Sequence, residues 1–374
     1  MKRTDHLQLS HGKIIYPVYL PDATFGVVRS VDAGDLINCQ IEAVVMNSYH
    51  LMQRPGSTTV QSLGGLNKMS GWQKPIFTDS GGFQAYSLIR QNAKFGQIQD
   101  KGLIFQPDGA NRKYQLTPEK SVQLQIGYGS DVVICLDDCT HAEDHDSEQE
   151  ISVERTIAWA KRSKKTFDQL IEQKKLGKNR PLIFGVIQGG NRKDLRKKCA
   201  DALLEIGFDG FGFGGWPLDG KGNLLEDILG YTRSLVPNEF PVHALGVGHP
   251  KNILACWQLG YEIFDSAMPT RDARHNRLYT FTTRDSDPLA GLSGNWMEYI
   301  YVSDKKHIKT AKPVSQHCDC LTCQNYSLGY LNHLFKINDG TYFRLATIHN
   351  LRFMTMLCER IRMKEQISLD QKYE

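Results

Sequence analysis

The sequence predicts an α/β fold: a (β/α)₈ barrel, or TIM barrel, with an inserted hairpin and a C-terminal zinc-binding subdomain. First, a short apolar run rich in β-forming residues recurs about eight times along the chain. Second, helix-like sequence separates several of these runs, which is typical of a parallel sheet buried on both faces. Eight such units favour a closed barrel over an open doubly wound sheet. Third, cysteines cluster near the C-terminus, where the strand pattern has ended.

Each predicted strand is an apolar run that ends near a polar residue or a glycine. The strands are expected at 16–21, 43–48, 75–79, 131–137, 182–188, 209–215, 242–248 and 262–266. At 374 residues the chain exceeds a usual domain, but a barrel with insertions reaches this size. We therefore expect the barrel and its catalytic rim in 1–285, and the zinc-binding subdomain with a helix packed on the barrel in 286–374.

Helices are expected between the strands, most clearly at 147–173, 192–206 and 249–260. The stretch 86–116 breaks this rhythm and predicts an inserted hairpin with its turn at "PDGAN" (107–111). The next helix should begin with Thr117 as its cap and Pro118 in its first position. A last helix at about 350–364 aligns four apolar side chains in one stripe: Leu351, Met354, Cys358 and Ile361.

The composition excludes several classes of protein. No apolar stretch approaches the roughly 20 residues that a membrane-spanning helix needs, and the N-terminus lacks the apolar core of a signal peptide. The net charge of +4 permits a polyanionic partner without requiring one. The nine cysteines are scattered apart from one cluster, which suits a reducing compartment better than a disulfide framework. We expect a cytoplasmic protein without membrane association.

Chemistry in such a barrel lies at the carboxyl ends of its strands. Those ends carry three carboxylate positions, one amide and several glycines: Asp79, Asp137 with Asp138, Gln188, Gly214 with Gly215, Gly246 with Gly248, and Asp265. A turn or cap role is the alternative for any single one of these aspartates, but three beside Gln188 favour a functional site. Two carboxylates suit cleavage of a glycosidic bond, and a carboxylate beside an amide suits the edge of a nucleobase. The residues alone leave the ligand open.

The cysteine cluster predicts a metal site. Cys318, Cys320, Cys323 and His349 form a C-x-C-x₂-C-x₂₅-H pattern. Three thiolates and one imidazole complete a tetrahedral zinc shell without a position for an activated water, so we expect one structural Zn²⁺ per chain. Free cysteines are the alternative.

Basic residues follow the strand that ends near Asp265. In "PTRDARHNR" these are Arg271, Arg274, His275 and Arg277, beside the proposed chemistry. This position favours contacts to a nucleic-acid backbone. Salt bridges to neighbouring acidic residues are the alternative.

Together these residues resemble the tRNA-guanine transglycosylase family, the queuine tRNA-ribosyltransferases, of the bacterial type. The matching stretches are "YHLMQRPG", "TDSGGFQAYSL", "DVVICLDDCT", "FGVIQGG", "GVGHP", "FDSAMPTRDAR" and "CDCLTCQNY" with His349. They run in family order from about residue 40 to 350, so the resemblance covers most of the chain. It implies a (β/α)₈ barrel whose zinc subdomain helps to dock tRNA, and exchange of the wobble guanine of GUN anticodons for a free 7-deazaguanine base.

The resemblance also implies roles for single residues. Asp265 matches the nucleophile that attacks C1′ of the ribose, and Asp79 matches the general acid/base. The positions implied in substrate binding are Ser80, Phe83, Asp137, Cys139, Gln188, Gly214, Gly215 and Trp216, with Phe83 stacking on the base and Gly215 offering its backbone. The residues implied in RNA binding are Arg271, Arg274 and His275. Family members act as dimers, so we expect a homodimer.

One departure from the family pattern concerns the incoming base. After "GFGG", bacterial members usually read close to L-A/S-V-G-E, whereas this chain has "WPLDG" (216–220). Trp216 and Pro217 should reshape the wall that contacts the 7-substituent, so queuine becomes an option beside preQ1. Two further hypotheses are a relative that inserts a 7-deazaguanine into DNA and a non-catalytic tRNA-binding partner subunit. The presence of both Asp79 and Asp265 argues against the second.

Overall fold

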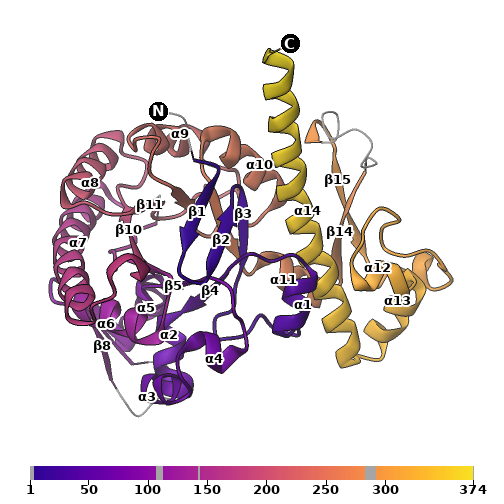
Figure 1. The fold of residues 1–374 in the computed structure, drawn as a ribbon, viewed down its shortest axis with the longest axis horizontal. Coiled ribbons are helices and arrows are strands. Elements are labelled where there is room, and N and C mark those ends of the chain that lie inside the picture. Colours follow the sequence, from indigo (N-terminus) through magenta and orange to yellow (C-terminus); the bar gives the residue numbers. More distant parts are fainter. Residues whose placement is uncertain (1–3, 107–112, 142–143, 283–291, 374) are drawn as a thin grey trace.

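The computed structural model describes residues 4–106, 113–141, 144–282 and 292–373. Its centre is one sheet of eight parallel strands in chain order around a barrel (Figure 1). The strands are β3 (Val18–Pro21), β4 (Val44–Asn47), β5 (Ile76–Asp79), β9 (Val132–Ile134), β10 (Leu182–Ile187), β11 (Gly210–Phe213), β12 (Val242–Ala244) and β13 (Ile263–Ser266). A parallel bridge between Asp22 and Val45 brings the first two strands together. The predicted fold class and all eight strand positions are confirmed.

Helices surround this barrel, as the alternating pattern predicts (Figure 1). They are α1 (Ala33–Asn38), α2 (Ser48–Leu51), α3 (Ser57–Ser62), α4 (Leu66–Ser70), α5 (Gly82–Gln91), α6 (Pro118–Tyr128), α7 (Asp146–Gln173), α8 (Lys193–Ile206), α9 (Glu226–Ser234), α10 (Pro250–Leu259) and α11 (Met268–Arg274). A kinked segment over Met52–Gly56, in which Arg54 has an extended backbone conformation, joins α2 to α3. Three predicted helices appear as α7, α8 and α10. The predicted cap of α6 is confirmed, because the Thr117 hydroxyl accepts from the Lys120 amide and Pro118 opens the helix.

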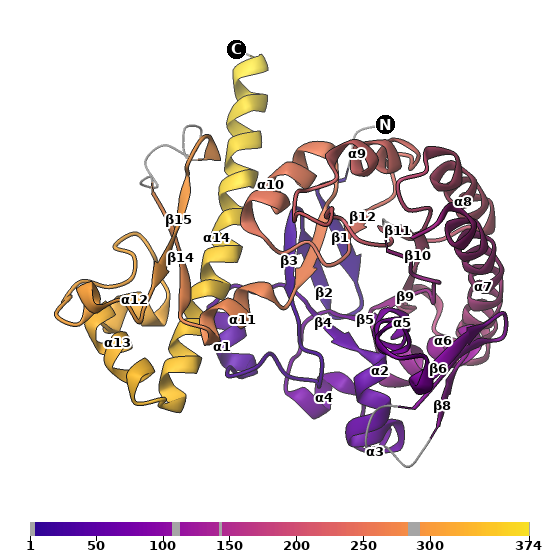
Figure 2. The same ribbon diagram turned by 180° about the vertical axis from the view of Figure 1, so that it is seen from behind.

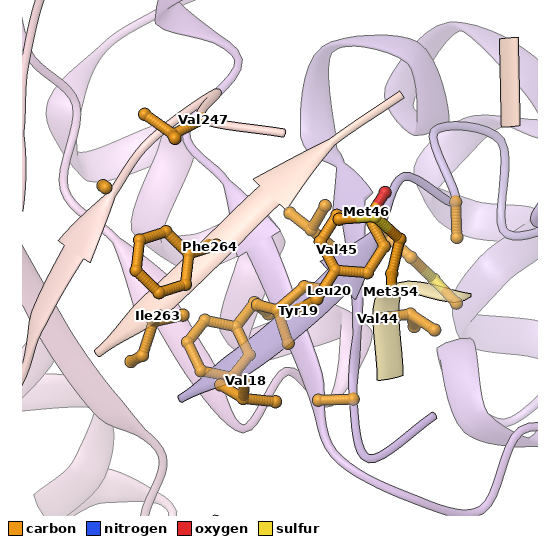
Figure 3. Close-up of a cluster of buried hydrophobic side chains, with 14 of the residues drawn as sticks. Val18, Tyr19, Leu20, Val44, Val45, Met46, Val247, Ile263, Phe264 and Met354 are labelled. Atoms are coloured by element: carbon orange, nitrogen blue, oxygen red, sulfur yellow. The ribbon is translucent and has the colours of Figure 1, made fainter. Parts of the chain in front are cut away.

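The barrel is held by apolar side chains on both sides of its strands. Figure 3 shows neighbouring members of this core from β3, β4 and β13, among them Tyr19, Val45 and Phe264, all at most 2% exposed. Met354, which belongs to the C-terminal helix, packs against the same group. The apolar runs are therefore continuous because both faces of each strand are covered.

The insertion differs in part from the prediction of a hairpin over 86–116. Its first residues belong to α5, and the following segment forms a three-stranded antiparallel sheet of β6 (Gly96–Gln99), β7 (Gly102–Phe105) and β8 (Tyr114–Leu116). The helix forms because Ala85 and Leu88 recur on its inner face and pack on the core. The turn expected at 107–111 lies outside the described residues.

The C-terminal part stands beside the barrel (Figures 1 and 2). It contains the antiparallel pair β14 (Arg277–Phe281) and β15 (Met297–Tyr301), and the helices α12 (Leu321–Asn325), α13 (Leu328–Lys336) and α14 (Gly340–Tyr373). The long helix α14 lies between the barrel and the other elements of this part (Figure 2). It includes the predicted helix at 350–364, whose four stripe residues are all buried. The division at residue 285 stays a prediction.

Two further features complete the described chain. An N-terminal hairpin of β1 (His6–Leu9) and β2 (Gly12–Ile15) precedes the barrel, and the His11 amide donates to Asp131, just before β9, at 3.0 Å. Among the helices in the described ranges, none has an apolar segment long enough to cross a membrane.

Candidate active site and metal centre

Asp79 is the last residue of β5 and lies at the carboxyl end of the barrel. Its Oδ2 accepts a hydrogen bond from Asn47 Nδ2 at 3.2 Å, from the equivalent end of β4. Burial, followed by the negative charge of Asp265, raises the pKa of Asp79 well above its ordinary value. A raised pKa favours the protonated form of a carboxyl group, and this form can donate a proton.

Asp265 in β13 is the second carboxylate of this rim, and its environment differs from that of Asp79. One of its oxygens, Oδ1, lies 2.8 Å from His243 Nε2 and accepts from the Gly246 amide at 2.9 Å. No donor in the described part of the chain reaches its other oxygen, Oδ2. The two aspartates thus form an unequal pair: one favours the protonated form, and the other receives two hydrogen bonds.

A third carboxylate, Asp22, follows β3 and was not among the predicted site residues. Burial raises the pKa of Asp22, and the charge of Asp265 contributes in the same direction. Its side chain accepts a hydrogen bond from Thr24. Asp22 directly follows a predicted strand ending at Pro21, so applying the same carboxyl-end rule to the first strand would have found it.

Asp137 and Gln188 form a second polar pair across neighbouring strands. The predicted strand 131–137 is shorter than expected, and Asp137 lies in the loop after Ile134. Gln188 Nε2 donates to Asp137 Oδ2 at 2.6 Å. Burial raises the pKa of Asp137 to about 6, although this hydrogen bond opposes the shift. Gln188 is fully buried, and its Oε1 has no hydrogen-bond partner among the described residues, so an acceptor remains for a ligand.

The glycines after β11 border this pair. A Cβ atom on Gly214 would stand 2.5 Å from Gln188 Nε2, which only glycine avoids. Gly215 has φ +89°, a left-handed conformation that favours glycine. The two positions therefore bring the backbone close to Gln188.

A buried arginine that no sequence pattern singles out supports these loops. Arg196 of α8 donates to the carbonyl oxygens of Ile187, Gly190 and Gly214, the last at 2.9 Å. Its guanidinium lies 4.1 Å from the centre of the Phe213 ring, and burial lowers its pKa to about 10. In the sequence it is one of several basic residues of an amphipathic helix, and only the fold turns it inward.

Aromatic side chains line the mouth of this region. Phe83 and Trp216 are 42% and 41% exposed, and their ring centres are 5.8 Å apart. The ring of His141, which was not predicted, lies 5.3 Å from that of Trp216.

Of the remaining predicted residues, Ser80 is buried and accepts from the Gly82 amide at 3.2 Å. Cys139 is buried as well, which raises the pKa of its thiol and keeps it neutral.

The predicted RNA-binding residues belong to α11 and the turn that follows it. Arg271 and His275 are exposed, and Arg274 is half-buried beside Arg271 and Arg29. In the described ranges none of the three predicted residues forms an ion pair, and Arg274 has a buried guanidinium nitrogen without a partner. Arg277, by contrast, pairs with Asp272 at 2.6 Å, so the salt-bridge alternative holds for this residue.

The predicted metal ligands come together in the C-terminal part. Cys318, Cys320, Cys323 and His349 are buried, and their ligand atoms all lie within 4.8 Å of one another. His349 Nε2 lies 2.8 Å from the Tyr279 carbonyl oxygen, which leaves Nδ1 facing the sulfurs, 3.2 Å from Cys323 Sγ. This arrangement fixes the imidazole as a zinc ligand requires. The donor set fits a closed structural zinc site.

Comparisons with known proteins agree with this geometry. The family described as queuine tRNA-ribosyltransferase matches residues 1–371. A queuine tRNA-ribosyltransferase of Halothermothrix orenii is 34% identical over 98% of this chain and 92% of its own length. A queuine tRNA-ribosyltransferase of Psychrobacter cryohalolentis is 36% identical over 96% of this chain and 88% of its own length. A putative queuine tRNA-ribosyltransferase of Archaeoglobus fulgidus is 35% identical over 96% of this chain and 92% of its own length. The chain therefore belongs to the queuine tRNA-ribosyltransferase family, the tRNA-guanine transglycosylases.

Proposed function

We propose that this protein exchanges the wobble guanine of tRNAs with GUN anticodons for a free 7-deazaguanine, through a covalent bond between Asp265 and the ribose. The observation that carries the proposal is the unequal pair at the barrel rim. Asp79 favours its protonated form, and Asp265 has one oxygen fixed by two donors and one without a donor in the described chain. An acid and a nucleophile are the two groups that a double displacement at C1′ requires.

The exchange takes place in two balanced steps. An Asp265 oxygen forms a bond to C1′ while the C1′–N9 bond breaks, and the electron pair of that bond passes to guanine, which Asp79 protonates. The incoming base then loses a proton to Asp79, attacks C1′ and displaces the Asp265 oxygen. Two displacements retain the configuration at C1′, and neither needs ATP or an oxidant.

The pair of Asp137 and Gln188 supports recognition of the base. Asp137 offers carboxylate acceptors, and the Gln188 oxygen is a buried acceptor without a partner in the described chain. A guanine or 7-deazaguanine turned out of the anticodon stack would present its N–H groups to these oxygens. Phe83 would cover its face at the mouth, and Gly215 and Ser80 would lie beside its edge.

Trp216 supports queuine as the incoming base beside preQ1. The large indole stands at the mouth, 41% exposed, where bacterial members of the family usually have a leucine. An exposed aromatic wall suits a bulky 7-substituent that extends towards solvent. A competition assay of tRNA exchange with guanine, preQ1 and queuine tests this assignment, and exclusive use of preQ1 would contradict it.

The other parts of the chain support tRNA as the partner. Arg271, Arg274 and His275 lie directly after the strand of the proposed nucleophile and would contact backbone phosphates. The zinc site would hold the C-terminal part in shape. The nine cysteines all lie in the described residues and none forms a disulfide, which supports a cytoplasmic location.

A homodimer is supported by exposed apolar side chains on and around α12 and α13. Leu321, Tyr330 and Ile337 are 40%, 42% and 56% exposed. An interface between two copies of the chain would cover these apolar side chains. Light scattering of the purified protein checks the dimer, and a monomeric mass at micromolar concentration would contradict it.

The test of the catalytic proposal is an Asp265→Ala variant. Wild-type enzyme incubated with tRNA is expected to form an adduct that survives denaturation, and the variant is expected to form none. An adduct in the variant would overturn the assignment of the nucleophile.

Radioactive guanine offered with tRNA and with DNA in parallel separates the main proposal from DNA insertion. Absence of labelling in both would favour a non-catalytic subunit.

A further inference from the structure

His243 is a titratable side chain inside the barrel for which the proposed function has no role. It belongs to β12, is fully buried and points at the end of the neighbouring strand β13. Its Nε2 lies 2.8 Å from Asp265 Oδ1. The Gly246 amide, in the loop after β12, donates to the same oxygen at 2.9 Å. Two groups separated by only three positions therefore hold one carboxylate oxygen from one side.

The surroundings of the ring define its protonation. A carboxylate oxygen only accepts hydrogen bonds, so the proton shared with Asp265 belongs to His243 Nε2. The other nitrogen, Nδ1, is buried and has no partner among the described residues. A proton there would leave a buried donor unsatisfied, so the ring is neutral with Nδ1 unprotonated. Its edge-on contact with Phe77, with ring centres 6.0 Å apart, is consistent with an apolar setting.

We propose that His243 is a positioning residue that, together with the Gly246 amide, holds Asp265 Oδ1 and so presents Oδ2 to C1′ of the ribose. This inference rests on the proposed function, in which Asp265 is the nucleophile. His243 donates one hydrogen bond and transfers no proton. Its effect has two parts: it fixes the rotamer of the carboxylate, and it stabilises the ionised form next to two other acids.

The second part matters because several groups face Asp265 from other strands. Asp79 of β5, Asp22 after β3 and the hydroxyl of Tyr19 on β3 all interact electrostatically with it. Neighbouring carboxylates disfavour a further negative charge. Donors on Oδ1 oppose this repulsion while leaving Oδ2 unengaged. A nucleophile needs both conditions, because only the ionised and correctly oriented oxygen attacks.

The simplest alternative is that the imidazole merely fills space in the barrel. Three variants separate the two roles. His243→Phe keeps a ring of similar size without the donor, and His243→Gln keeps an N–H donor on a flexible side chain. Phe77→Leu loosens the packing against the imidazole and leaves its hydrogen bond in place.

The readout is the single-turnover rate of adduct formation with saturating tRNA, measured across pH. We expect His243→Phe to slow this rate at least about tenfold and to change its pH profile, while the affinity for tRNA changes less than about twofold. His243→Gln should recover most of the rate, and Phe77→Leu should lower the melting temperature with the rate nearly unchanged. Equal rates and pH profiles for wild type and His243→Phe, or no recovery in His243→Gln, would overturn the proposal.

A measurement on the wild-type protein covers the case in which His243→Phe does not fold. In spectra of protein labelled with ¹⁵N-histidine, one ring should be protonated at Nε2 and not at Nδ1. That signal should change in Asp265→Ala. A doubly protonated ring, or the opposite tautomer, would contradict the proposal. An adduct that persists in Asp265→Ala would instead refute the proposed function itself, so the two failures are distinguishable.

Discussion

Gly214→Ala is expected to damage base exchange by displacing Gln188. The added Cβ would stand 2.5 Å from Gln188 Nε2 and 2.7 Å from Val186 Cγ1, whereas ordinary contacts begin at about 3.4 Å. Gln188 would have to retreat by about 0.9 Å, the difference between these values. Its 2.6 Å hydrogen bond to Asp137 would then stretch to about the limit of a hydrogen bond.

The expected losses follow from these distances. A misplacement of about 1 Å at a reacting site costs about 10²-fold in rate, so kcat/KM for the incoming base should fall by about this factor. Overpacking of this kind also destabilises a protein by about 1–3 kcal/mol. Exchange of radioactive guanine into tRNA measures the first effect, and urea unfolding measures the second.

Gly340→Ala is the matched control. Gly340 opens α14, and no neighbouring atom lies within 4 Å of the place that an alanine methyl group would take. Alanine there should therefore change stability by less than about 1 kcal/mol and leave exchange intact. If Gly214→Ala exchanged guanine within twofold of the wild-type rate, the proposed coupling of Gly214, Gln188 and base recognition would be refuted.

Two further predictions concern Asp137 and the metal centre. The pKa of Asp137 is raised from 3.8 to about 6, so its burial favours the neutral form and its destabilising effect grows as pH rises from 4 to 6. Asp137→Asn should therefore be more stable than wild type above pH 6 and equally stable below about pH 4. The variant should also be poor in base exchange. Equal melting curves of the two proteins at pH 8 would contradict the predicted gain in stability. Purified protein should contain about one equivalent of zinc per chain. Cys323→Ala should lose the metal and unfold at lower temperature, and less than about half an equivalent in the wild type would refute the site.

Sequence patterns determined the features that depend on local order. Continuous apolar runs such as 182–188 indicate a strand covered on both faces, and eight of them indicate a barrel. Thr117 and Pro118 define a helix start because capping involves only the next few residues. The spacing of Cys318, Cys320 and Cys323 predicts a metal site for the same reason, and the structure places their ligand atoms within 4.8 Å of one another and of His349.

The tertiary structure decided which side chains meet across strands. Arg196 has nothing in its local sequence that separates it from the lysines around it, and only packing turns it towards Gly214. His243 is an isolated histidine in an apolar run, and only the neighbouring strand brings Asp265 within 2.8 Å. Likewise Asp79 and Asp265 are equivalent in sequence, both carboxylates at strand ends. Burial and hydrogen-bond donors make them different, because the protonation of a carboxyl group depends on its three-dimensional surroundings.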